Sequence, residues 1–570
     1  MKAAKLLVCC LENEGVEYIF GIPGEENLEI MDALLDSKIR FITTRHEQGA
    51  AFMADVYGRL TGKAGVCLAT LGPGATNLVT GVADANMDHA PLVAIAGQAA
   101  TNRLHKESHQ VLDLVDMFQP ITKYATQILE PEITAEVVRK AFKLAQTEKP
   151  GACFIDFPEN VAAMDVADAP LRAQFATTSE PPADRVQAAA DVISAARNPM
   201  VLAGNGVVRA RASQQLTEFA ERLHIPVANT FMAKGVIPFK HPMALGSAGL
   251  QARDYVSCGF EQADVIICVG YDLVEYHPYL WHPTRDRKII HIDTCPAEVD
   301  ASYVVEVGVV GDIQLSLTRI ADLAAPRREL SRDAIPVLRE SPASPSMARR
   351  APSSMAYPMR ALREALSEEM RRHRADESFP LKPQKIIWDL RTALGLEDIV
   401  ICDVGAHKMW MARMFRCEYP NTCIISNGFA SMGIAVPGAV AARLANRQRA
   451  VVAVTGDAGF MMNSQEIETA MRVGTPLVVL IWTDNSYGLI EWKQMNSFQR
   501  VSHCRFGNPD FVKYAESFGA KGYRVERAAD LLPILKRALA DNTVSVIDCP
   551  VDYRENAKLT EQLGDVICPT

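Results

Sequence analysis

Several features that would assign this chain to a specialised class are missing from its sequence. No stretch approaches about 18 uninterrupted apolar residues, so we expect neither a membrane-spanning helix nor a membrane partner. The 13 cysteines form no CxxC pair and no His/Cys cluster at zinc spacing, which predicts buried, reduced thiols in a cytoplasmic protein. An excess of positive charge is also lacking: the formal net charge is -9, which argues against nucleic acid as a partner.

What is present is the composition of a large α/β protein. The 570 residues are too many for one hydrophobic core, and 48% hydrophobic with 22% charged residues is typical of globular domains. Short β-rich apolar runs alternate with helical patterns, which predicts an α/β fold of three doubly wound, parallel-sheet domains. We place these domains at residues 1–167, 183–325 and 376–560, with a Pro-, Ser- and Arg-rich linker at 326–375 and a tail at 561–570.

Thirteen strands are predicted from the apolar runs. They are Tyr18–Phe20, Arg40–Thr43, Gly65–Ala69, Leu92–Ala96 and Cys153–Phe157 in the first block, Met200–Ala203, Val265–Val269 and Lys288–Ile292 in the second, and Ile399–Cys402, Cys423–Ser426, Ala450–Thr455, Leu477–Trp482 and Val544–Cys549 in the third. The first and third blocks are similar in size and strand content, which hints at two related domains.

The most informative run is the end of the predicted strand at Ala450–Thr455, which continues as Gly456-Asp457-Ala458-Gly459. Ligands of parallel sheets bind beyond the carboxyl ends of strands, and glycines there let a phosphate approach backbone N–H groups. A carboxylate would repel a bare phosphate, so Asp457 indicates a divalent cation between the two. An ordinary turn with a helix-capping Asp is the alternative interpretation of this run.

A second acid follows the next predicted strand. Asp484 lies 27 residues after Asp457, one helix and one strand later, which places another oxygen ligand at a neighbouring strand end. Mg²⁺ prefers octahedral oxygen ligands, here carboxylates, a carbonyl, water and phosphate.

The two acids and their spacing resemble the diphosphate and metal motif of thiamine-diphosphate enzymes. Asp at position 484, where the family usually has Asn, is similar to acetolactate synthases of the catabolic, flavin-independent type. This resemblance implies that Asp457, Asp484 and the backbone carbonyl of Ser486 hold Mg²⁺. It also implies that the domains at 1–167 and 376–560 bind the pyrimidine and the diphosphate of the cofactor.

Further motifs carry the same resemblance. The runs Phe20–Gly24, Arg45–Ala51 and Gly72–Asn77 resemble the family's pyrimidine domain, and Asp403–Trp410 resembles its other diphosphate loop. The residues then implied to contact thiamine diphosphate are Pro23, Gly24, Glu47, Thr76, Asn77, Gly405, Ala406, His407, Ala430, Met432, Gly456, Asp457, Ala458, Gly459, Asp484, Ser486 and Tyr487.

Two residues are expected to be catalytic. Taken alone, Glu47 follows a strand and begins an apolar helix, so an acid that favours the helix dipole would explain it. By resemblance it is the acid that hydrogen-bonds the aminopyrimidine and activates the cofactor. Gln110 matches a family glutamine that could donate to the substrate oxygen, and a surface-loop amide is its alternative. Met432 matches the apolar support of the folded cofactor, and a gap-filling core Met is its alternative.

The resemblance implies decarboxylation of pyruvate, a 2-oxo acid, and its ligation to a second pyruvate to give 2-acetolactate and CO₂. It also implies a homodimer at least, with a homotetramer expected. FAD is disfavoured, because Tyr271–Pro278 replaces the segment that flavin-containing relatives use. Gly488 and Lys234 depart from the catabolic pattern, which leaves a pyruvate oxidase, lyase or acetyltransferase acting on a 2-oxo acid or acyl-CoA as alternatives. A non-catalytic nucleotide-binding protein is the alternative of a different class.

Overall fold

The computed structural model describes residues 1–174, 177–249, 255–325, 367–368 and 370–559, and the chain in it divides into two compact units. One unit combines Met1–Thr177 with His373–Phe415 and Asn421–Glu555. The other is formed by Thr178–Arg372, Arg416–Pro420 and Asn556–Thr570. The predicted linker at 326–375 and tail at 561–570 fall almost entirely outside the described residues, and the predicted domain boundaries stay a prediction.

Three six-stranded sheets form the framework, and every neighbouring pair of named strands in them is parallel. The first sheet contains β1 (Tyr18–Gly21), β2 (Arg40–Thr43), β3 (Gly65–Ala69), β4 (Leu92–Gln98), β5 (Tyr124–Gln127) and β6 (Ala152–Pro158). The second contains β7 (Pro199–Ala203), β8 (Val227–Asn229), β9 (Ala244–Ser247), β10 (Val265–Val269), β11 (Lys288–Asp293) and β12 (Val305–Val310). The third contains β13 (Ile399–Cys402), β14 (Cys423–Ile425), β15 (Val451–Gly456), β16 (Val478–Thr483), β17 (Lys521–Arg524) and β18 (Ser545–Pro550).

Helices connect the strands and cover the sheets. Around the first sheet lie α1 (Ala3–Asn13), α2 (Leu28–Leu34), α3 (Glu47–Thr61), α4 (Pro73–Met87), α5 (Leu114–Phe118), α6 (Thr134–Gln146) and α7 (Glu159–Ala162). Around the second lie α8 (Ala183–Ala195), α9 (Asn205–Arg209), α10 (Ser213–Leu223), α11 (Tyr255–Gln262), α12 (Pro278–Trp281) and α13 (Ile313–Leu323). Around the third lie α15 (Pro383–Ala393), α16 (Ala406–Met414), α17 (Ala435–Ala445), α18 (Asp457–Asn463), α19 (Glu466–Val473), α20 (Gly488–Phe498), α21 (Phe511–Ser517) and α22 (Leu531–Ala540).

The strand orders bear on the two related domains that the sequence hinted at. The first sheet has the order β2-β1-β3-β4-β6-β5 and the third has β14-β13-β15-β16-β18-β17, which is the same order counted from each first strand. The second sheet, β12-β11-β10-β7-β8-β9, follows a different doubly wound order. The predicted α/β class of three doubly wound parallel sheets is confirmed.

All thirteen predicted strands are present, to within a few residues at their ends. The five that the sequence did not predict are β5, β8, β9, β12 and β17; β8 lies next to a sheet edge and the other four are edge strands. Central strands such as β4 and β15 are apolar almost throughout, because helices cover both faces of a parallel sheet.

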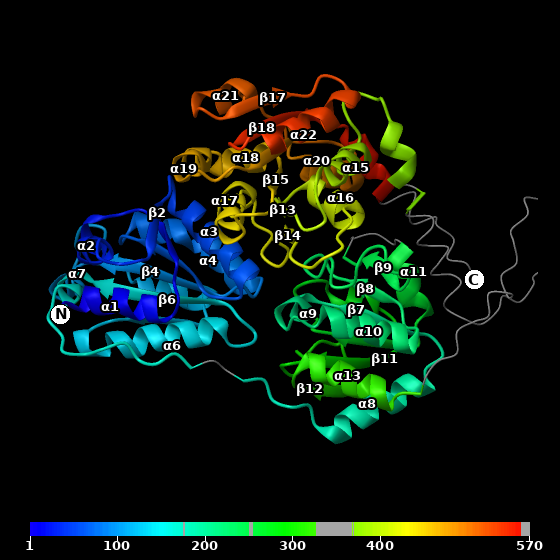
Figure 1. The fold of residues 1–570 in the computed structure, drawn as a ribbon, viewed down its shortest axis with the longest axis horizontal. Helices are drawn as coiled ribbons and strands as arrows, with labels where there is room; N and C mark the ends of the chain where they lie inside the picture. Colours follow the sequence, from blue (N-terminus) through cyan, green and yellow to red (C-terminus); the bar gives the residue numbers. More distant parts are fainter. Residues whose placement is uncertain (175–176, 250–254, 326–366, 369, 560–570) are drawn as a thin grey trace, which may run out of the picture. The chain divides into compact units, whose positions relative to one another are not determined.

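One hydrophobic core joins the first and third sheets. It includes Ala50 and Met53 of α3 together with Ala439 and Val440 of α17, all fully buried. Figure 1 shows α3, α4 and α17 side by side between these sheets. Helix α3 begins after His46, whose Nδ1 accepts from the N–H of Gln48, and ends at Gly62 in the left-handed conformation (φ +72°).

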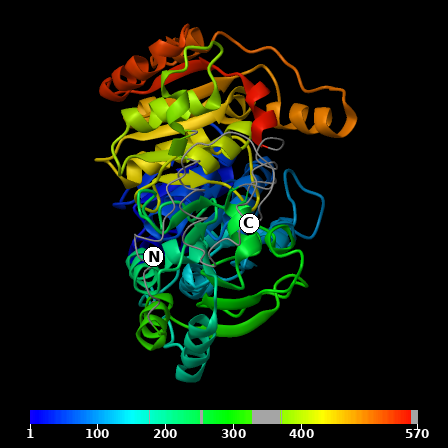
Figure 2. The ribbon, with the colours of Figure 1, turned by 90° about the vertical axis from the view of Figure 1, so that its right-hand side faces the viewer.

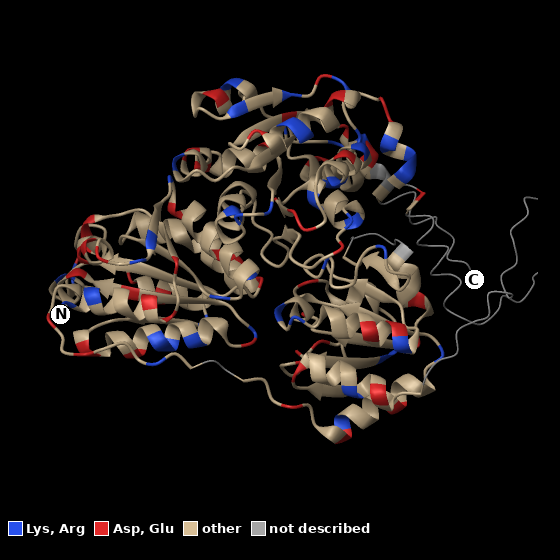
Figure 3. Ribbon diagram, in the orientation of Figure 1, with Lys and Arg blue, Asp and Glu red and all other residues tan. Residues whose placement is uncertain are grey.

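Charges and cysteines fit the expected class with one exception. Figure 3 shows acidic and basic residues interspersed along the helices of both units. None of the helices that the structure describes is long and apolar enough to cross a membrane. Eleven cysteines of the described residues form no disulfide, whereas Cys258 is disulfide-bonded, so the expectation of uniformly reduced thiols is wrong there.

Candidate active site

The candidate site lies where the third sheet reverses its strand order. Strands β13 and β15 are neighbours, and their connections leave in opposite directions, which opens a crevice beyond their carboxyl ends. The loop after β13 carries Asp403 and Gly405, and β15 ends at Gly456. The structure therefore brings together two glycine-containing runs that the sequence analysis selected separately.

Asp403 organises this crevice, a role that the sequence analysis did not assign. Its buried carboxylate accepts the backbone N–H groups of Val404 (2.7 Å), Gly433 (2.8 Å) and Ala435 (3.2 Å), and the hydroxyl of Thr455 (3.3 Å). Burial raises the pKa of Asp403 to about 6, although all four hydrogen bonds act in the opposite direction. The residue ties the ends of β13 and β15 to the loop before α17, and its position directly after a buried strand was the available signal.

His407 is buried beside both glycines. Its Nε2 has no hydrogen-bond partner among the described residues, and burial lowers its pKa to about 3, so the ring is neutral. A Cβ at Gly405 (φ +155°) would lie 2.9 Å from His407 Cε1, and one at Gly456 would lie 3.5 Å from the same atom. The crevice thus holds a buried ring nitrogen with unused hydrogen-bonding capacity, next to backbone that only glycine leaves open.

Two carboxylates face each other at the ends of β15 and β16. Asp457 Oδ2 accepts the N–H groups of Asp484 (3.2 Å) and Asn485 (2.7 Å), and Oδ1 accepts that of Ala458 (2.9 Å). Burial, followed by the charge of Asp457, raises the pKa of Asp484 to about 7, and burial also raises the pKa of Asp457. A buried acid and a half-buried acid that repel each other form a site suited to a cation.

The sequence analysis did not predict all of the residues that surround this acid pair. Asn508 donates to Asp457 Oδ2 at 2.8 Å and to Asn485 Oδ1 at 2.9 Å, from a loop to which the sequence analysis assigned no role. Ser486 is buried, and its hydroxyl donates to Glu491 at 2.5 Å. No group of three or more His, Cys, Asp or Glu side chains able to hold a metal occurs among the described residues, so the predicted metal set rests on two carboxylates and one backbone carbonyl.

The remaining predicted residues of the third domain lie around this crevice. Gly459 follows Asp457 in α18, and a Cβ there would lie 3.1 Å from Asp403 Oδ1. Ala430 adopts φ +56° in the loop before α17, followed by half-buried Met432. The ring of Tyr487 packs edge-on against Phe506 with centroids 5.1 Å apart. A Cβ at Gly488, where the sequence departs from the catabolic pattern, would lie 2.6 Å from Asp484 Oδ2.

A second cluster lies beyond the carboxyl ends of β1, β2 and β3 in the first sheet. Glu47, only 8% exposed, begins α3, and its Oε2 accepts from Asn77 Nδ2 of α4 at 3.0 Å. A Cβ at Gly74 would lie 3.5 Å from Glu47 Oε1, so this oxygen faces a position with no side chain. The hydroxyl of Thr76, also predicted, is exposed and donates to the carbonyl of Pro73 at 3.1 Å.

Gln110 and the Pro23–Gly24 turn complete the first-domain cluster. Gln110 is exposed, adopts φ +59°, and its Cβ would lie 2.8 Å from a Cβ at Gly72, directly before α4. Pro23 is exposed, and the N–H of Gly24 donates to Asn27 at 2.9 Å. The structure thus groups Glu47, Asn77 and Gln110 around the start of α4, and their roles stay a prediction.

Helices α18 and α19 connect the two clusters within this unit. Asn463 donates to Gln48 Oε1 (3.0 Å) and to the carbonyl of Gly433 (3.1 Å). Buried Glu466 accepts the N–H groups of Arg45 (3.1 Å) and His46 (3.1 Å), and burial raises its pKa to about 7. The start of α3, which carries Glu47, is therefore held by the third domain.

A buried ion cluster fixes the loop that leads to Met432. The Arg59 guanidinium contacts Asp55 (2.7 Å), Asp84 (2.8 Å) and Asp88 (2.9 Å), all fully buried. The first domain in turn grips the loop after β14, because Asp84 accepts the hydroxyl of Ser426 at 2.7 Å. The sequence showed only a helix with two acids and gave no sign of this contact.

The middle domain contains a glycine turn that a side chain already occupies. The carboxylate of Glu275 accepts the N–H of Asn205 at 3.0 and 3.1 Å, and a Cβ at Gly204 would lie 2.3 Å from the carbonyl of Gly270. Burial raises the pKa of Glu275 to about 8. Lys234, the second position at which the sequence departs from the catabolic pattern, is buried in this domain and donates to Ser247 at 3.3 Å.

Comparison with known families matches each of the three domains. Residues 1–117 match the N-terminal TPP binding domain of thiamine pyrophosphate enzymes, residues 186–320 match the central domain, and residues 403–549 match the C-terminal TPP binding domain. The fold and these matches define the chain as a thiamine pyrophosphate enzyme. Thiamine pyrophosphate is the cofactor also called thiamine diphosphate.

Curated relatives narrow the class. The chain is 36% identical to an acetolactate synthase of Bacillus subtilis, covering 99% of this chain and 97% of that protein. It is 36% identical to the catabolic acetolactate synthase of Raoultella terrigena, covering 98% and 97%. It is 35% identical to a probable acetolactate synthase large subunit of Methanocaldococcus jannaschii, covering 97% and 93%. The chain belongs to the thiamine-diphosphate-dependent acetolactate synthase family.

Proposed function

We propose that this protein decarboxylates pyruvate and joins the remaining two-carbon unit to a second pyruvate, giving 2-acetolactate. Two pyruvate anions and one proton yield one acetolactate anion and CO₂. The observation that carries the proposal is the acid pair Asp457 and Asp484 together with His407, whose Nε2 has no hydrogen-bond partner among the described residues, in a chain of this family. The names of the relatives support pyruvate condensation over the other reactions of the class.

The residues of the crevice fit a diphosphate and a cation. Asp457, Asp484 and the Ser486 carbonyl supply the hard oxygen ligands that Mg²⁺ prefers. His407 Nε2 can donate to a terminal phosphate oxygen, since the neutral ring carries one proton that either nitrogen can hold. Gly405, Ala406, Gly456, Ala458 and Gly459 leave backbone accessible to phosphate, and Ala430, Met432 and Tyr487 surround the crevice.

The first-domain cluster fits the role expected at the pyrimidine. When bound, thiamine diphosphate supplies a nucleophilic carbon and an electron sink for decarboxylation. Glu47 would hold a proton on Oε1 toward the pyrimidine ring nitrogen, while Asn77 keeps Oε2 in place. Pro23, Gly24 and Thr76 border this cluster, and Gln110 could donate to the substrate oxygen from its exposed loop. The buried setting of Glu47 limits water around the proton that it holds.

The assembly that we propose is a homodimer at least, with a homotetramer expected and a cytoplasmic location. Helix α20 supports a partner surface: it has no buried residue, and it exposes Ile490 (48%) and Phe498 (68%). Figure 2 shows α20, in orange, standing apart from the third sheet. Sedimentation velocity of the full chain would test this part, and a single monomer peak would contradict it.

For the middle domain we propose that the Gly204–Gly206 turn does not hold a flavin. The side chain of Glu275 takes the N–H group that a flavin diphosphate would need. A purified protein with the absorption of bound FAD would contradict this, and would favour the pyruvate oxidase alternative.

Product analysis tests the main proposal. The protein is incubated with thiamine diphosphate, Mg²⁺ and labelled pyruvate, and CO₂ and the carbon skeleton of the product are measured. We expect one CO₂ and one acetolactate per two pyruvates, and no activity after chelation of the metal until Mg²⁺ is restored. CO₂ with acetaldehyde, acetyl phosphate or acetyl-CoA as product would assign another reaction of the class.

A further inference from the structure

A cavity of about 520 Å³ lies away from the candidate active site, at the opposite end of the third sheet. Its lining comes from the segments that enter the sheet: Arg443 and Arg447 precede β15, Thr475 and Pro476 precede β16, and Asn542 precedes β18. Asp457 and Asp484 follow the carboxyl ends of these strands. A strand of six residues spans about 20 Å, so the cavity is a separate place in the molecule.

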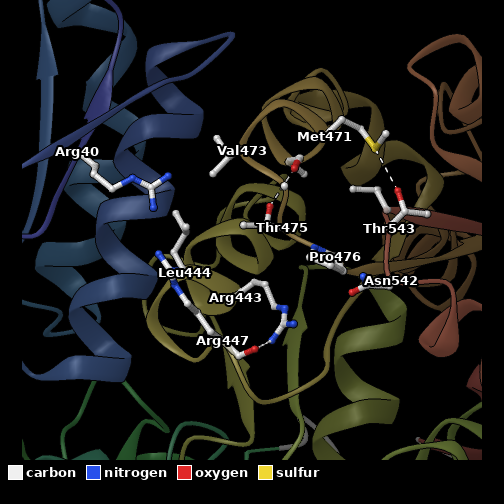
Figure 4. Close-up of a pocket in the computed structure, with 13 residues that line it drawn as sticks. Arg40, Arg443, Leu444, Arg447, Met471, Val473, Thr475, Pro476, Asn542 and Thr543 are labelled. Carbon is white, nitrogen blue, oxygen red and sulfur yellow. Dashed lines mark hydrogen bonds between the residues drawn. The ribbon is translucent and has the colours of Figure 1, made fainter.

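Three arginines line this cavity and no acid does. Arg40 comes from β2 of the first domain, and Arg443 and Arg447 come from the end of α17 in the third (Figure 4). The acids that act on these arginines, Asp398 on Arg443 and Glu17 on Arg447, are not among the lining residues. Three like charges around one hollow repel each other, and a polyanion in the hollow would relieve that repulsion.

The arginines are held in place and still have donors to spare. Arg447 Nη2 donates to the hydroxyl of Tyr18 at 3.0 Å, and the guanidinium of Arg40 lies over the ring of the same tyrosine, 5.6 Å from its centroid. Buried Tyr18 thus positions the guanidinium groups of Arg40 and Arg447, which come from two different domains. No hydrogen bond or ion pair of the Arg40 side chain is made to any described residue. Arg443 is different, since its Nη1 caps α17 by donating to three carbonyls, among them Arg449 at 2.9 Å.

Apolar side chains form the other wall. Leu444, Met471, Val473 and Pro476 line the hollow beside the arginines, and Figure 4 shows them around the same space. The volume falls in the range of small-molecule sites, which combine apolar walls with a few charged groups. Planar guanidinium groups bind phosphate through paired N–H donors, and three of them match a ligand with two to four negative charges.

We propose that this cavity binds an organic polyphosphate of nucleotide size. Its phosphates contact Arg40, Arg443 and Arg447, and its organic part packs on Leu444, Met471 and Pro476. Because the arginines come from two domains that share one core, the ligand bridges those domains. The site goes beyond the proposed reaction and is independent of it.

Titration calorimetry with ATP tests the proposal on the full-length protein, already saturated with thiamine diphosphate and Mg²⁺ so that the cofactor's diphosphate site is taken. We expect one ATP per chain at low salt, and binding weakened at least about tenfold by Arg40→Gln and by Arg447→Gln. Arg449→Gln is the matched control, because that arginine pairs with exposed Glu397 and does not line the cavity, and we expect its affinity to stay within about twofold. Tyr18→Phe should weaken binding less than Arg447→Gln does, since it removes only the hydroxyl that positions Arg447.

Two further ligands separate the parts of the proposal. Inorganic tripolyphosphate should bind more weakly than ATP, and adenosine should not bind measurably. Equal affinity of tripolyphosphate and ATP would overturn the role of the apolar wall. No binding of ATP, or equal weakening by all three arginine substitutions, would overturn the site itself, whatever reaction the enzyme is found to catalyse.

Discussion

The carboxylate of Asp88 accepts the backbone N–H of Gly428 at 2.6 Å, across 340 residues of chain. The same side chain accepts the N–H of Asn427 at 3.0 Å and contacts Arg59 at 2.9 Å. A helix of the first domain therefore holds the backbone of the loop that continues to Met432. The conformation of that loop depends on a charge cluster with one arginine and three buried acids.

Replacement of Arg59 by Met should be strongly destabilising. The change leaves Asp55, Asp84 and Asp88 buried without their shared cation, and burial together with the neighbouring acids already raises the pKa of Asp84. Loss of one partner of a buried ion pair costs about 3–5 kcal/mol, and we expect a loss of that size in the free energy of unfolding. Urea denaturation followed by circular dichroism measures it.

Arg449→Met serves as the control for Arg59. Its ion pair with Glu397 is exposed, so the expected cost is about 1 kcal/mol or less. Equal effects of the two substitutions would show that the buried cluster contributes nothing special to stability.

Glu47→Gln should abolish most of the turnover while the protein still binds its cofactor. In the proposed role the carboxyl group holds a proton toward the pyrimidine, which an amide cannot do, and we expect kcat to fall about 100-fold or more. The change keeps the size of a side chain that is 8% exposed, so the melting temperature should move little. Steady-state kinetics with pyruvate measure the loss, with exposed Glu25→Gln as the control. Full activity of Glu47→Gln would favour the non-catalytic alternative.

His407→Ala should weaken the binding of thiamine diphosphate about 10- to 100-fold, the range expected for a hydrogen bond to a charged group. Nε2 has no partner among the described residues, so this ring nitrogen is available to a ligand. Because the pKa is lowered to about 3, the ring stays neutral from pH 6 to 8 and should cause no step in affinity near pH 6.5. Calorimetric titration with the cofactor measures this, and exposed His503→Ala should change nothing.

Glu466 should make the stability of the unit that contains the first and third sheets depend on pH. Its folded pKa of about 7 lies above the ordinary value of 4.5, so the folded state binds the proton more tightly than the unfolded state does. The stability that this provides is present below about pH 4.5 and is lost as the pH rises through 7. The loss is on the order of 3 kcal/mol.

The Glu466→Gln variant tests the sign. We expect its melting temperature to change less between pH 5 and 8 than that of the unmodified protein, because the amide does not titrate. Glu468→Gln removes a half-exposed acid paired with Arg472. Its charge makes only a small contribution to the raised pKa of Glu466, so this variant should reduce the pH dependence much less than Glu466→Gln does. A steeper pH dependence in Glu466→Gln would contradict the raised pKa.

Local sequence patterns were sufficient to predict the central strands of the first and third sheets and the edge strands β2 and β14, but not the edge strands β5, β9, β12 and β17. Strand β16 is apolar over nearly its full length, because helices cover both faces, whereas β5 (YATQ) and β17 (KGYR) are only half buried. A half-buried edge strand of four residues has neither a continuous apolar run nor a clear alternation. Its position is determined by pairing with β6 or β18, which the sequence does not reveal.

The same distinction applies to the candidate site. Asp457, Asp484 and His407 could be predicted because each lies in a short motif at a strand end. Asn463 and Asp88 could not, since their partners lie hundreds of residues away and a lone Asn or Asp in a helix is ordinary. The contact of Glu275 with the Gly204–Gly206 turn could not be predicted either, because the turn and the acid are 70 residues apart in the sequence.

The shared core of α3 and α17 has a consequence for synthesis of the chain. More than 370 residues separate the end of α3 at Thr61 from the start of α17 at Ala435. At ribosomal rates of roughly 5–20 residues per second, the apolar face of α3 waits about 20–75 s for its covering helix to be made. During that interval Ala50 and Met53 of the nascent chain are exposed to other molecules. The yield of the protein in cells should therefore depend on the supply of chaperones, whereas the stability of the folded enzyme should not.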